Sequence, residues 1–201
     1  MRHAESRRDK EQGKIHMKLK VITSNPGKVR EYQESLSHLG IEMEHLHLPY
    51  DEIQTFDLEE VVDKGIIEIL GKGIDGFIID DSGLFINGLK GFPGVWSAFV
   101  QKTIGNEGIL KLMENVDDRD AEFRCCIGCH MKGETIIVTG ICKGKILYEE
   151  KGTGGFGYDP LFSLDGMTSF AQISTEEKNR FSHRGNATRL LIEEILKRNL
   201  V

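Results

Sequence analysis

The chain has 201 residues, of which 39% are hydrophobic and 29% are charged, and its formal net charge is −6. This length suits a single domain with a sizeable core, and we expect neither a membrane span of about 20 apolar residues nor a signal peptide. The negative charge argues against broad nucleic-acid binding, which depends on clustered Lys and Arg. It leaves room for a local basic pocket that binds a small anion.

Residues 1–16 differ in composition from the rest of the chain. They carry five basic and three acidic residues without apolar periodicity, and a second methionine, Met17, follows them. Segments that cannot bury apolar surface remain disordered. We expect a disordered N-terminal extension at 1–16, with a functional basic arm as the alternative, and a single folded domain at 17–201.

The first half of the chain alternates predicted strands with predicted helices. Apolar periodicity indicates strands at 18–24, 41–48 and 76–81 and amphipathic helices at 28–40 and 57–71. Strands that alternate with helices form an α/β layer with parallel pairing.

The second half is richer in strands. A helix is expected at 103–116, and a long hairpin at 121–131 and 134–147 turns at Lys132–Gly133. A further amphipathic helix at 187–200 closes the chain. The pattern predicts one α/β unit with a mixed, twisted sheet and a cleft between two lobes.

The four cysteines include a C-x-x-C motif at Cys126 and Cys129, followed by His130, so zinc has to be considered. Both cysteines fall on a predicted strand, where residues three apart face opposite sides. We therefore expect structural thiols rather than a zinc site. Reduced cysteines suit a cytoplasmic protein.

The segment TSNPGK joins the first strand to the first helix. Backbone N–H groups at a helix start attract anions, and a lysine adds a full positive charge. The spacing is not that of a P-loop, and a capped turn with a solvated lysine is the alternative. Its residues are Thr23, Ser24, Asn25, Pro26, Gly27 and Lys28.

Two adjacent carboxylates, Asp80 and Asp81, follow the apolar run FII, and Glu52 is a possible third. Side chains alternate along a strand, so one carboxylate can hold a basic side chain while the other faces a cleft. A cleft carboxylate is a suitable ligand for Mg²⁺. The alternative is an Asp-Ser turn that ends the strand.

A glycine-rich segment, GTGGFGYDP, contains Phe156 and Tyr158. Glycines let the backbone approach a ligand while the rings offer stacking surfaces, which contribute about 1–3 kcal/mol per base. The alternative is a hairpin loop whose aromatic rings pack inward.

A basic segment, STEEKNRFSHRG, is expected as a loop before the last helix. It carries Lys178, His183 and Arg184, which are suited to phosphate or to the carbonyl edge of a base. Solvated surface is the alternative for this segment alone. Taken together, the four segments describe a pocket for a metal-bound nucleoside triphosphate.

These motifs resemble the inosine triphosphate pyrophosphatase family, which hydrolyses non-standard purine nucleotides. The resemblance runs from about Leu19 to the last helix, and EIQ and GNEGILKLM are most similar to the archaeal branch. It rests on TSNPGK, DDSGL, GFPGVWSAF, GGFGYDPLF, FAQISTEEKN and SHRG in family order.

The resemblance implies an elongated, bent mixed sheet with a nucleotide cleft between two lobes, and a homodimer. The implied reaction converts a nucleoside triphosphate and water into the monophosphate and pyrophosphate, with Mg²⁺. Glu52 and Asp81 match the metal ligands, and Asp81 also matches the general base. Lys28 and Lys64 match phosphate contacts. The matched substrate contacts are Ser82, Phe156, Gly157, Tyr158, Asp159, Lys178, His183 and Arg184.

Two other interpretations remain at this point. A Maf-like pyrophosphatase has a related shape and acts on other nucleotides. A nucleotide-binding regulator without catalysis is the second, although DDSG and both lysines argue against it.

Overall fold

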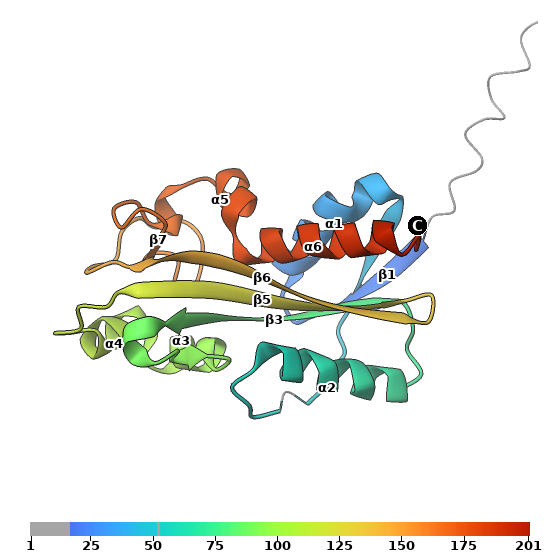
Figure 1. The fold of residues 1–201 in the computed structure, drawn as a ribbon, viewed down its shortest axis with the longest axis horizontal. Helices are drawn as coiled ribbons and strands as arrows, with labels where there is room; N and C mark the ends of the chain where they lie inside the picture. The colour runs from blue at the N-terminus through green and yellow to red at the C-terminus, as the bar shows by residue number, and fades with distance from the viewer. Residues whose placement is uncertain (1–16, 52) are drawn as a thin grey trace, which may run out of the picture.

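The computed structural model describes residues 17–51 and 53–201 (Figure 1). The predicted extension at 1–16 and Glu52 lie outside the described residues. The described chain forms a seven-stranded mixed sheet in the order β2-β1-β3-β5-β6-β7, with β4 paired to β3. Helices cover both faces of this sheet. In the described ranges, no helix has the length and apolar character needed to cross a membrane.

The strands are long in the middle of the sheet and short at its edges. They are β1 Met17–Ile22, β2 Ile41–Leu46, β3 Phe77–Ile86, β4 Pro93–Gly94, β5 Asp120–Met131, β6 Glu134–Ile146 and β7 Phe162–Ser163. The helices are α1 Pro26–Leu36, α2 Leu58–Gly71, α3 Ser97–Thr103, α4 Gly105–Leu112, α5 Thr175–Phe181 and α6 His183–Lys197.

In the parallel part of the sheet the strand order reverses at β1: β2 is added on one side of it and β3 on the other. β1 pairs in parallel with β2 on one side and with β3 on the other. The helix α1 connects β1 to β2, and α2 connects β2 to β3, so the two crossovers move across the sheet in opposite directions. Because crossovers share one hand, the two helices lie on opposite faces, as Figure 1 shows.

The core has three parts: one on each face of the sheet, and a third in the lobe around α3 and α4, which we call the far lobe. One part joins α1 and α6 to the sheet through residues such as Tyr32, Ile78 and Leu191. A second lies under α2 on the opposite face, around Val62 and Ile79. The third fills the lobe that contains α3, α4 and the segment that leads to α5. It includes Leu84, Ile86, Val100, Ile109, Tyr158, Phe162 and Phe170.

The cysteine prediction is confirmed by the sheet. Cys129 packs with the α1 and α6 side of the core, whereas Cys126 packs with the α2 side, so the two face away from each other. All four cysteines are free and buried. Burial raises the pKa of Cys126 and Cys129 to about 12, so both thiols are protonated at neutral pH.

Three predicted element boundaries are wrong. The strand β3 does not end at the acidic pair but continues to Ile86, because Asp80 and Asp81 pair with Ile127 and Cys126 of β5. The predicted helix at 103–116 corresponds to α4, which ends at Leu112, and the preceding helix α3 at Ser97–Thr103 was not predicted.

The third error concerns the basic segment, which is helical rather than a loop. Ser174 caps α5 by accepting a hydrogen bond from the backbone N–H of Glu177. Ser182 ends α5 and caps α6 by accepting from the N–H of Gly185 at 3.0 Å. Each serine satisfies a backbone donor that a helix start otherwise leaves without a partner. Lys178 therefore lies on α5, while His183 and Arg184 open α6.

Glycine allows α6 to lie directly on the sheet. A Cβ atom at Gly140 of β6 would be 2.1 Å from the backbone nitrogen of Ala187 and 2.3 Å from the carbonyl oxygen of His183. Because Gly140 has no side chain, β6 and the first turns of α6 can lie in direct contact. This turn carries the residues that the basic segment contributes to the predicted site.

Gly140→Ala is expected to lower the free energy of unfolding by about 1–3 kcal/mol, because the new methyl group meets backbone that cannot rotate away. Gly71→Ala, at the exposed end of α2, is the matched control, since its Cβ has no neighbour within 4 Å. Urea unfolding of both variants measures the difference. Equal stability of the two variants would contradict the close packing of α6.

Candidate active site

An open stretch of the edge of β3 lies at the centre of the predicted site. On this edge β1 pairs with Phe77 and Ile78, and β4 pairs with Leu84 and Phe85. Between these pairs, no described strand covers residues 79–83. This opening lies beside the carboxyl end of β1, where the parallel sheet reverses its direction. Open α/β sheets bind ligands at such positions.

The TSNPGK segment lies at this opening. The chain leaves β1 at Ile22, and α1 begins at Pro26, two residues earlier than predicted. Asn25 caps the helix by accepting a hydrogen bond from the N–H of Gly27 at 2.9 Å, and Thr23 Oγ1 accepts from the N–H of Asn25 at 3.1 Å. The predicted anion site at this turn therefore has an ordered, capped helix start at its base. Ser24, Asn25 and Pro26 are exposed.

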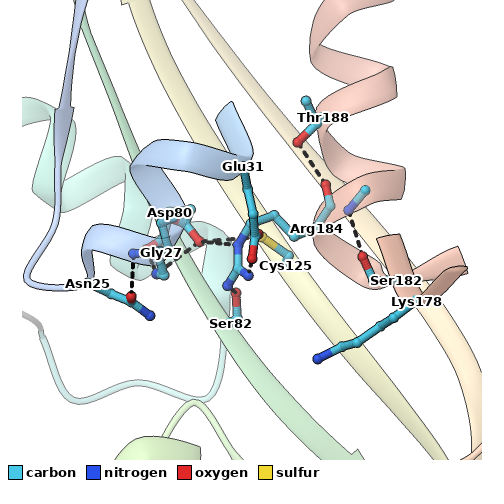
Figure 2. Close-up of polar contacts among 12 residues, drawn as sticks. Asn25, Gly27, Glu31, Asp80, Ser82, Cys125, Lys178, Ser182, Arg184 and Thr188 are labelled. Carbon is cyan, nitrogen blue, oxygen red and sulfur yellow. Dashed lines mark hydrogen bonds and ion pairs between the residues drawn. The ribbon is translucent and has the colours of Figure 1, made fainter. Parts of the chain in front are cut away.

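Asp80 is the buried charge of the site. Its Oδ2 atom lies 2.9 Å from Lys28 Nζ and 3.2 Å from Arg184 Nε, and Lys28 also donates to the Asp80 carbonyl oxygen at 3.3 Å. Figure 2 shows Asp80 between α1 and the Arg184 side chain. Burial alone would raise the pKa of Asp80, but the two cations lower it to about 2. Asp80 is thus ionised at neutral pH.

Arg184 reaches from α6 to three acceptors, two on β3 and one on α1 (Figure 2). Besides Asp80, its Nη1 lies 3.0 Å from Glu31 Oε2 on α1, and its Nη2 lies 3.4 Å from Ser82 Oγ on β3. The guanidinium is therefore fixed in the plane that these acceptors define. The predicted contact of Arg184 with a nucleobase stays a prediction.

A second cationic group lies on α5. Lys178 Nζ is 2.6 Å from Asp159 Oδ2 and 4.6 Å from the centre of the Phe156 ring. Asp159 Oδ2 also accepts a hydrogen bond from the N–H of Phe156 at 2.8 Å. The glycine-rich segment and α5 are thereby joined, and the ring of Phe156 remains 59% exposed. An exposed ring beside a lysine can stack against a planar ligand.

His183 lies close enough to both cationic groups to be affected by their charges. Its ring is buried and stacks on Phe123 with a centroid distance of 4.8 Å. Burial, and then the charges of Arg184 and Lys178, hold the pKa of His183 well below its usual value, so the ring is neutral at pH 7. In the described part of the chain its Nδ1 atom is buried without a hydrogen-bond partner.

Tyr158 has a different role from the stacking surface that its sequence context suggested. Its ring is buried in the far lobe, and its hydroxyl donates a hydrogen bond to the Ser97 carbonyl oxygen at 2.8 Å. The carbonyl oxygen of the adjacent Gly157 accepts from Gln101 and Asn106, at 3.3 and 3.2 Å. The inward-packed alternative is thus correct for Tyr158, whereas Phe156 remains on the surface.

Asp81 lies on the opposite face of β3 from Asp80, as predicted from strand alternation. It is half-buried, and its Oδ1 accepts a hydrogen bond from the N–H of Ser82 at 2.8 Å. It lines a cavity of about 570 Å³ on the α2 and α3 side. The other lining residues are Ile53, Gln54, Val61, Phe92, Val95, Trp96, Phe99 and Val100. Lys64 lies one helical turn beyond Val61 on α2, and its side chain is exposed.

The donor chemistry around Asp81 fits a hard divalent cation. Mg²⁺ prefers oxygen ligands and is often held by one or two carboxylates together with substrate phosphates and water. Among the described residues there is no group of three His, Cys, Asp or Glu side chains that could hold a metal ion. Glu52, the second predicted ligand, lies outside those residues, and its role stays a prediction.

The structure thus brings together Lys28, Ser82 and Arg184 around Asp80, and Phe156, Asp159 and Lys178 around a second ion pair. Asp81 and Lys64 lie across the sheet from these groups, and the open edge of β3 lies between the two sides.

Sequence reasoning missed Glu31 and the aromatic wall of the cavity. Glu31 lies on α1, and only its distance to Arg184 in the folded structure shows that it belongs to the site. The aromatic residues Phe92, Trp96 and Phe99 lie in the GFPGVWSAF motif. The sequence feature that could have indicated this aromatic wall is the concentration of large apolar residues among glycines in the motif. The short helix α3 begins within the same motif.

The sequence profile of the Ham1 family matches residues 19–194. A dITP/XTP pyrophosphatase of Pyrococcus horikoshii is 51% identical over 178 residues, which cover 88% of this chain and 96% of that protein. One from Thermococcus kodakarensis is 50% identical over 175 residues, covering 86% and 94%.

Among solved structures, the Ham1 protein of Staphylococcus aureus superposes with a TM-score of 0.80 at 27% identity. The alignment covers 90% of this chain and 99% of that one. Profile, sequence and fold therefore agree over nearly all of the described residues. The chain belongs to the Ham1 family.

Proposed function

We propose that this protein hydrolyses non-standard purine nucleoside triphosphates, such as ITP, dITP and XTP, to the monophosphate and pyrophosphate. The observation that carries this proposal is the open edge of β3, with Lys28 and Arg184 held at Asp80 on one face of the sheet and Asp81 beside a cavity on the other face. The names of the archaeal relatives support the same activity. They favour it over the Maf-like alternative.

The phosphate end of the substrate lies, in this proposal, between α1 and α2. The positive end of the α1 helix dipole and the charge of Lys28 attract the phosphates from one side. Lys64 approaches from the exposed face of α2. A triphosphate carries about four negative charges, so these groups have to offset charge before water can approach phosphorus.

Asp81 is the proposed general base at the α-phosphorus. Its carboxylate faces the cavity, and the backbone N–H of Ser82 orients it by a hydrogen bond to Oδ1. The other oxygen can accept a proton from the attacking water. A Mg²⁺ ion at Asp81 and Glu52 would offset phosphate charge. The adjacent Asp80 does not compete for this role, because it is tied to two cations on the other face.

The base end lies, in this proposal, at α5 and the first turn of α6. Phe156 offers an exposed ring for stacking, and Lys178 supplies a donor for a carbonyl oxygen. His183 is neutral, so it can donate from one ring nitrogen and accept at the other. This combination suits the carbonyl and N–H of hypoxanthine and xanthine.

We also propose that the protein is a cytoplasmic homodimer. Phe56 and Phe99 are 83% and 67% exposed, and Phe56 contacts Trp96 edge to face with a centroid distance of 4.9 Å. Large exposed aromatic residues of this kind mark association surfaces. Four free, buried thiols are suited to a reducing compartment.

Asp81→Asn is expected to lower kcat for ITP by at least a hundredfold, because the near-isosteric amide can neither accept a proton nor balance a cation. Asp117→Asn, at an exposed position between α4 and β5, is the control. Pyrophosphate release with Mg²⁺, and again after chelation with EDTA, measures the effect. Turnover of Asp81→Asn near that of the control would contradict the assignment.

Lys28→Ala and Lys64→Ala should each cost about 2–4 kcal/mol in kcat/KM, if both charges stabilise the phosphates in the transition state. Only Lys28→Ala should also lower the melting temperature, since it leaves the buried Asp80 with one cation fewer. Lys111→Ala, on the exposed face of α4, is the control. Unchanged kcat/KM in both site variants would show that these lysines are not phosphate ligands.

Substrate preference should follow the polarity of the base edge. Hypoxanthine presents a carbonyl and an N–H where adenine presents an amino group and a bare nitrogen. Two mismatched polar groups at about 1–3 kcal/mol each predict a preference for ITP over ATP of roughly a thousandfold. GTP should be hydrolysed faster than ATP, because guanine differs from hypoxanthine only by one amino group and keeps the carbonyl and the N–H.

Pyrophosphate release from ITP, XTP, GTP and ATP under the same conditions tests this preference. Arg184→Ala should reduce the ratio of the ITP rate to the ATP rate, because it lowers the rate of ITP hydrolysis more than that of ATP hydrolysis. Equal rates on ITP and ATP in the unmodified protein would contradict the proposed base site.

A further inference from the structure

One carboxylate oxygen connects the two ends of the proposed substrate site. Lys28 Nζ and Arg184 Nε both bind Asp80 Oδ2, at 2.9 and 3.2 Å. Lys28 belongs to the proposed phosphate end, and Arg184 belongs to the base end. Because both cations share a single acceptor, a movement of either one changes the position available to the other.

The cluster is closed and electrically balanced. The Asp80 side chain is 1% exposed, while Lys28 and Arg184 are 17% and 9% exposed. Glu31 provides a second carboxylate for Arg184. Two cations and two anions therefore sum to a formal charge of zero before any substrate arrives.

Apolar packing that does not involve this cluster also holds the surrounding elements together. Apolar residues already join α1, β3 and α6 in one core, through Tyr32, Leu36, Ile78, Ala187 and Leu191. Buried ion pairs are on average no more stabilising than apolar residues of similar volume. A role in the position of the two cations explains the cluster better than a role in stability.

We propose that Asp80 is a positioning residue that couples the phosphate end of the site to the base end by holding Lys28 and Arg184 on one oxygen. This inference rests on the proposed roles of those two cations. It gives the first aspartate of the DDSG motif a function distinct from that of the second. Asp81 acts on the cavity side, and Asp80 sets where two substrate-binding cations are held.

The single variant Asp80→Asn separates this role from a purely structural one. The amide keeps the shape but loses the charge that holds both cations, so kcat for ITP should fall at least tenfold. KM should not rise, because the cluster gains one net positive charge and still attracts the triphosphate. A rise in KM with unchanged kcat would overturn the proposal.

Glu194→Gln is the matched control. Glu194 is also a carboxylate bound by two cations, Lys197 at 2.9 Å and Arg198 at 3.1 Å, but it lies in the last turns of α6, away from the site. It should keep the kcat and KM of the unmodified protein. If Asp80→Asn behaves like this control, the proposal fails.

A double-mutant cycle tests the coupling directly. Lys28→Met and Arg184→Met are measured singly and together, in kcat/KM for ITP, with Asp80 intact and again with Asp80→Asn. With Asp80 intact, the combined loss should differ from the product of the single losses at least fivefold. With Asp80→Asn, the losses should multiply to within twofold.

The outcomes distinguish this proposal from the function on which it rests. If neither single variant loses activity, the proposed roles of Lys28 and Arg184 fail, and the coupling fails with them. If both lose activity but the non-additivity persists in Asp80→Asn, coupling passes through the substrate and only the role of Asp80 is overturned. Should Asp80→Asn not fold, Asp80→Glu replaces it, because it keeps the charge and displaces the shared oxygen. The same loss of coupling is then expected.

Discussion

The arrangement of the proposed site depends on one buried ion cluster, in which Asp80 is held between Lys28 and Arg184. A carboxylate that is 1% exposed is costly to bury unless cations and hydrogen bonds compensate for the lost water. The two cations lower the pKa of Asp80 to about 2, so the cluster remains charged across the physiological range. This requirement fixes the start of α1 and the start of α6 relative to β3. The proposed phosphate and base ends are thereby placed on either side of one strand edge.

The edge itself follows from the topology of the sheet. Growth of the parallel sheet in both directions from β1 puts α1 and α2 on opposite faces, and β3 extends well beyond the end of β1. The side chains in this part of β3 point alternately to the two faces of the sheet. Consecutive side chains can then serve opposite sides of a ligand, so Asp80 and Asp81 need not repel each other across one pocket.

Much of this could be read from the sequence, because the signals are local. Alternation and helical periodicity predicted the order of strands and helices, and the β5–β6 hairpin turns where expected. The opposite faces of Cys126 and Cys129 followed from strand geometry alone. The boundary errors also have local causes: polar residues suggested that β3 ended at Asp80, although pairing with β5 carries the strand on to Ile86.

The partners of the buried charge could not be read in this way. Lys28, Asp80 and Arg184 are distant in sequence, and only the sheet and the packing of α6 bring them together. Sequence reasoning matched Lys28 and Arg184 to substrate contacts, and it expected one of the two adjacent aspartates to hold a basic side chain without naming that partner. The structure shows that Lys28 and Arg184 share one oxygen atom of Asp80.

The same contact limits how the ligand-free site can bind anions. Lys28, Lys178 and Arg184 each already have a carboxylate partner, so a phosphate or a base has to share that partner or displace it. A site with unpaired lysines and arginines would bind any polyphosphate tightly, including the pyrophosphate product. Because binding a substrate and its transition state equally well gives no increase in kcat, a partly neutralised site favours turnover over retention. The buried aspartate can therefore moderate the affinity of the site as well as its geometry.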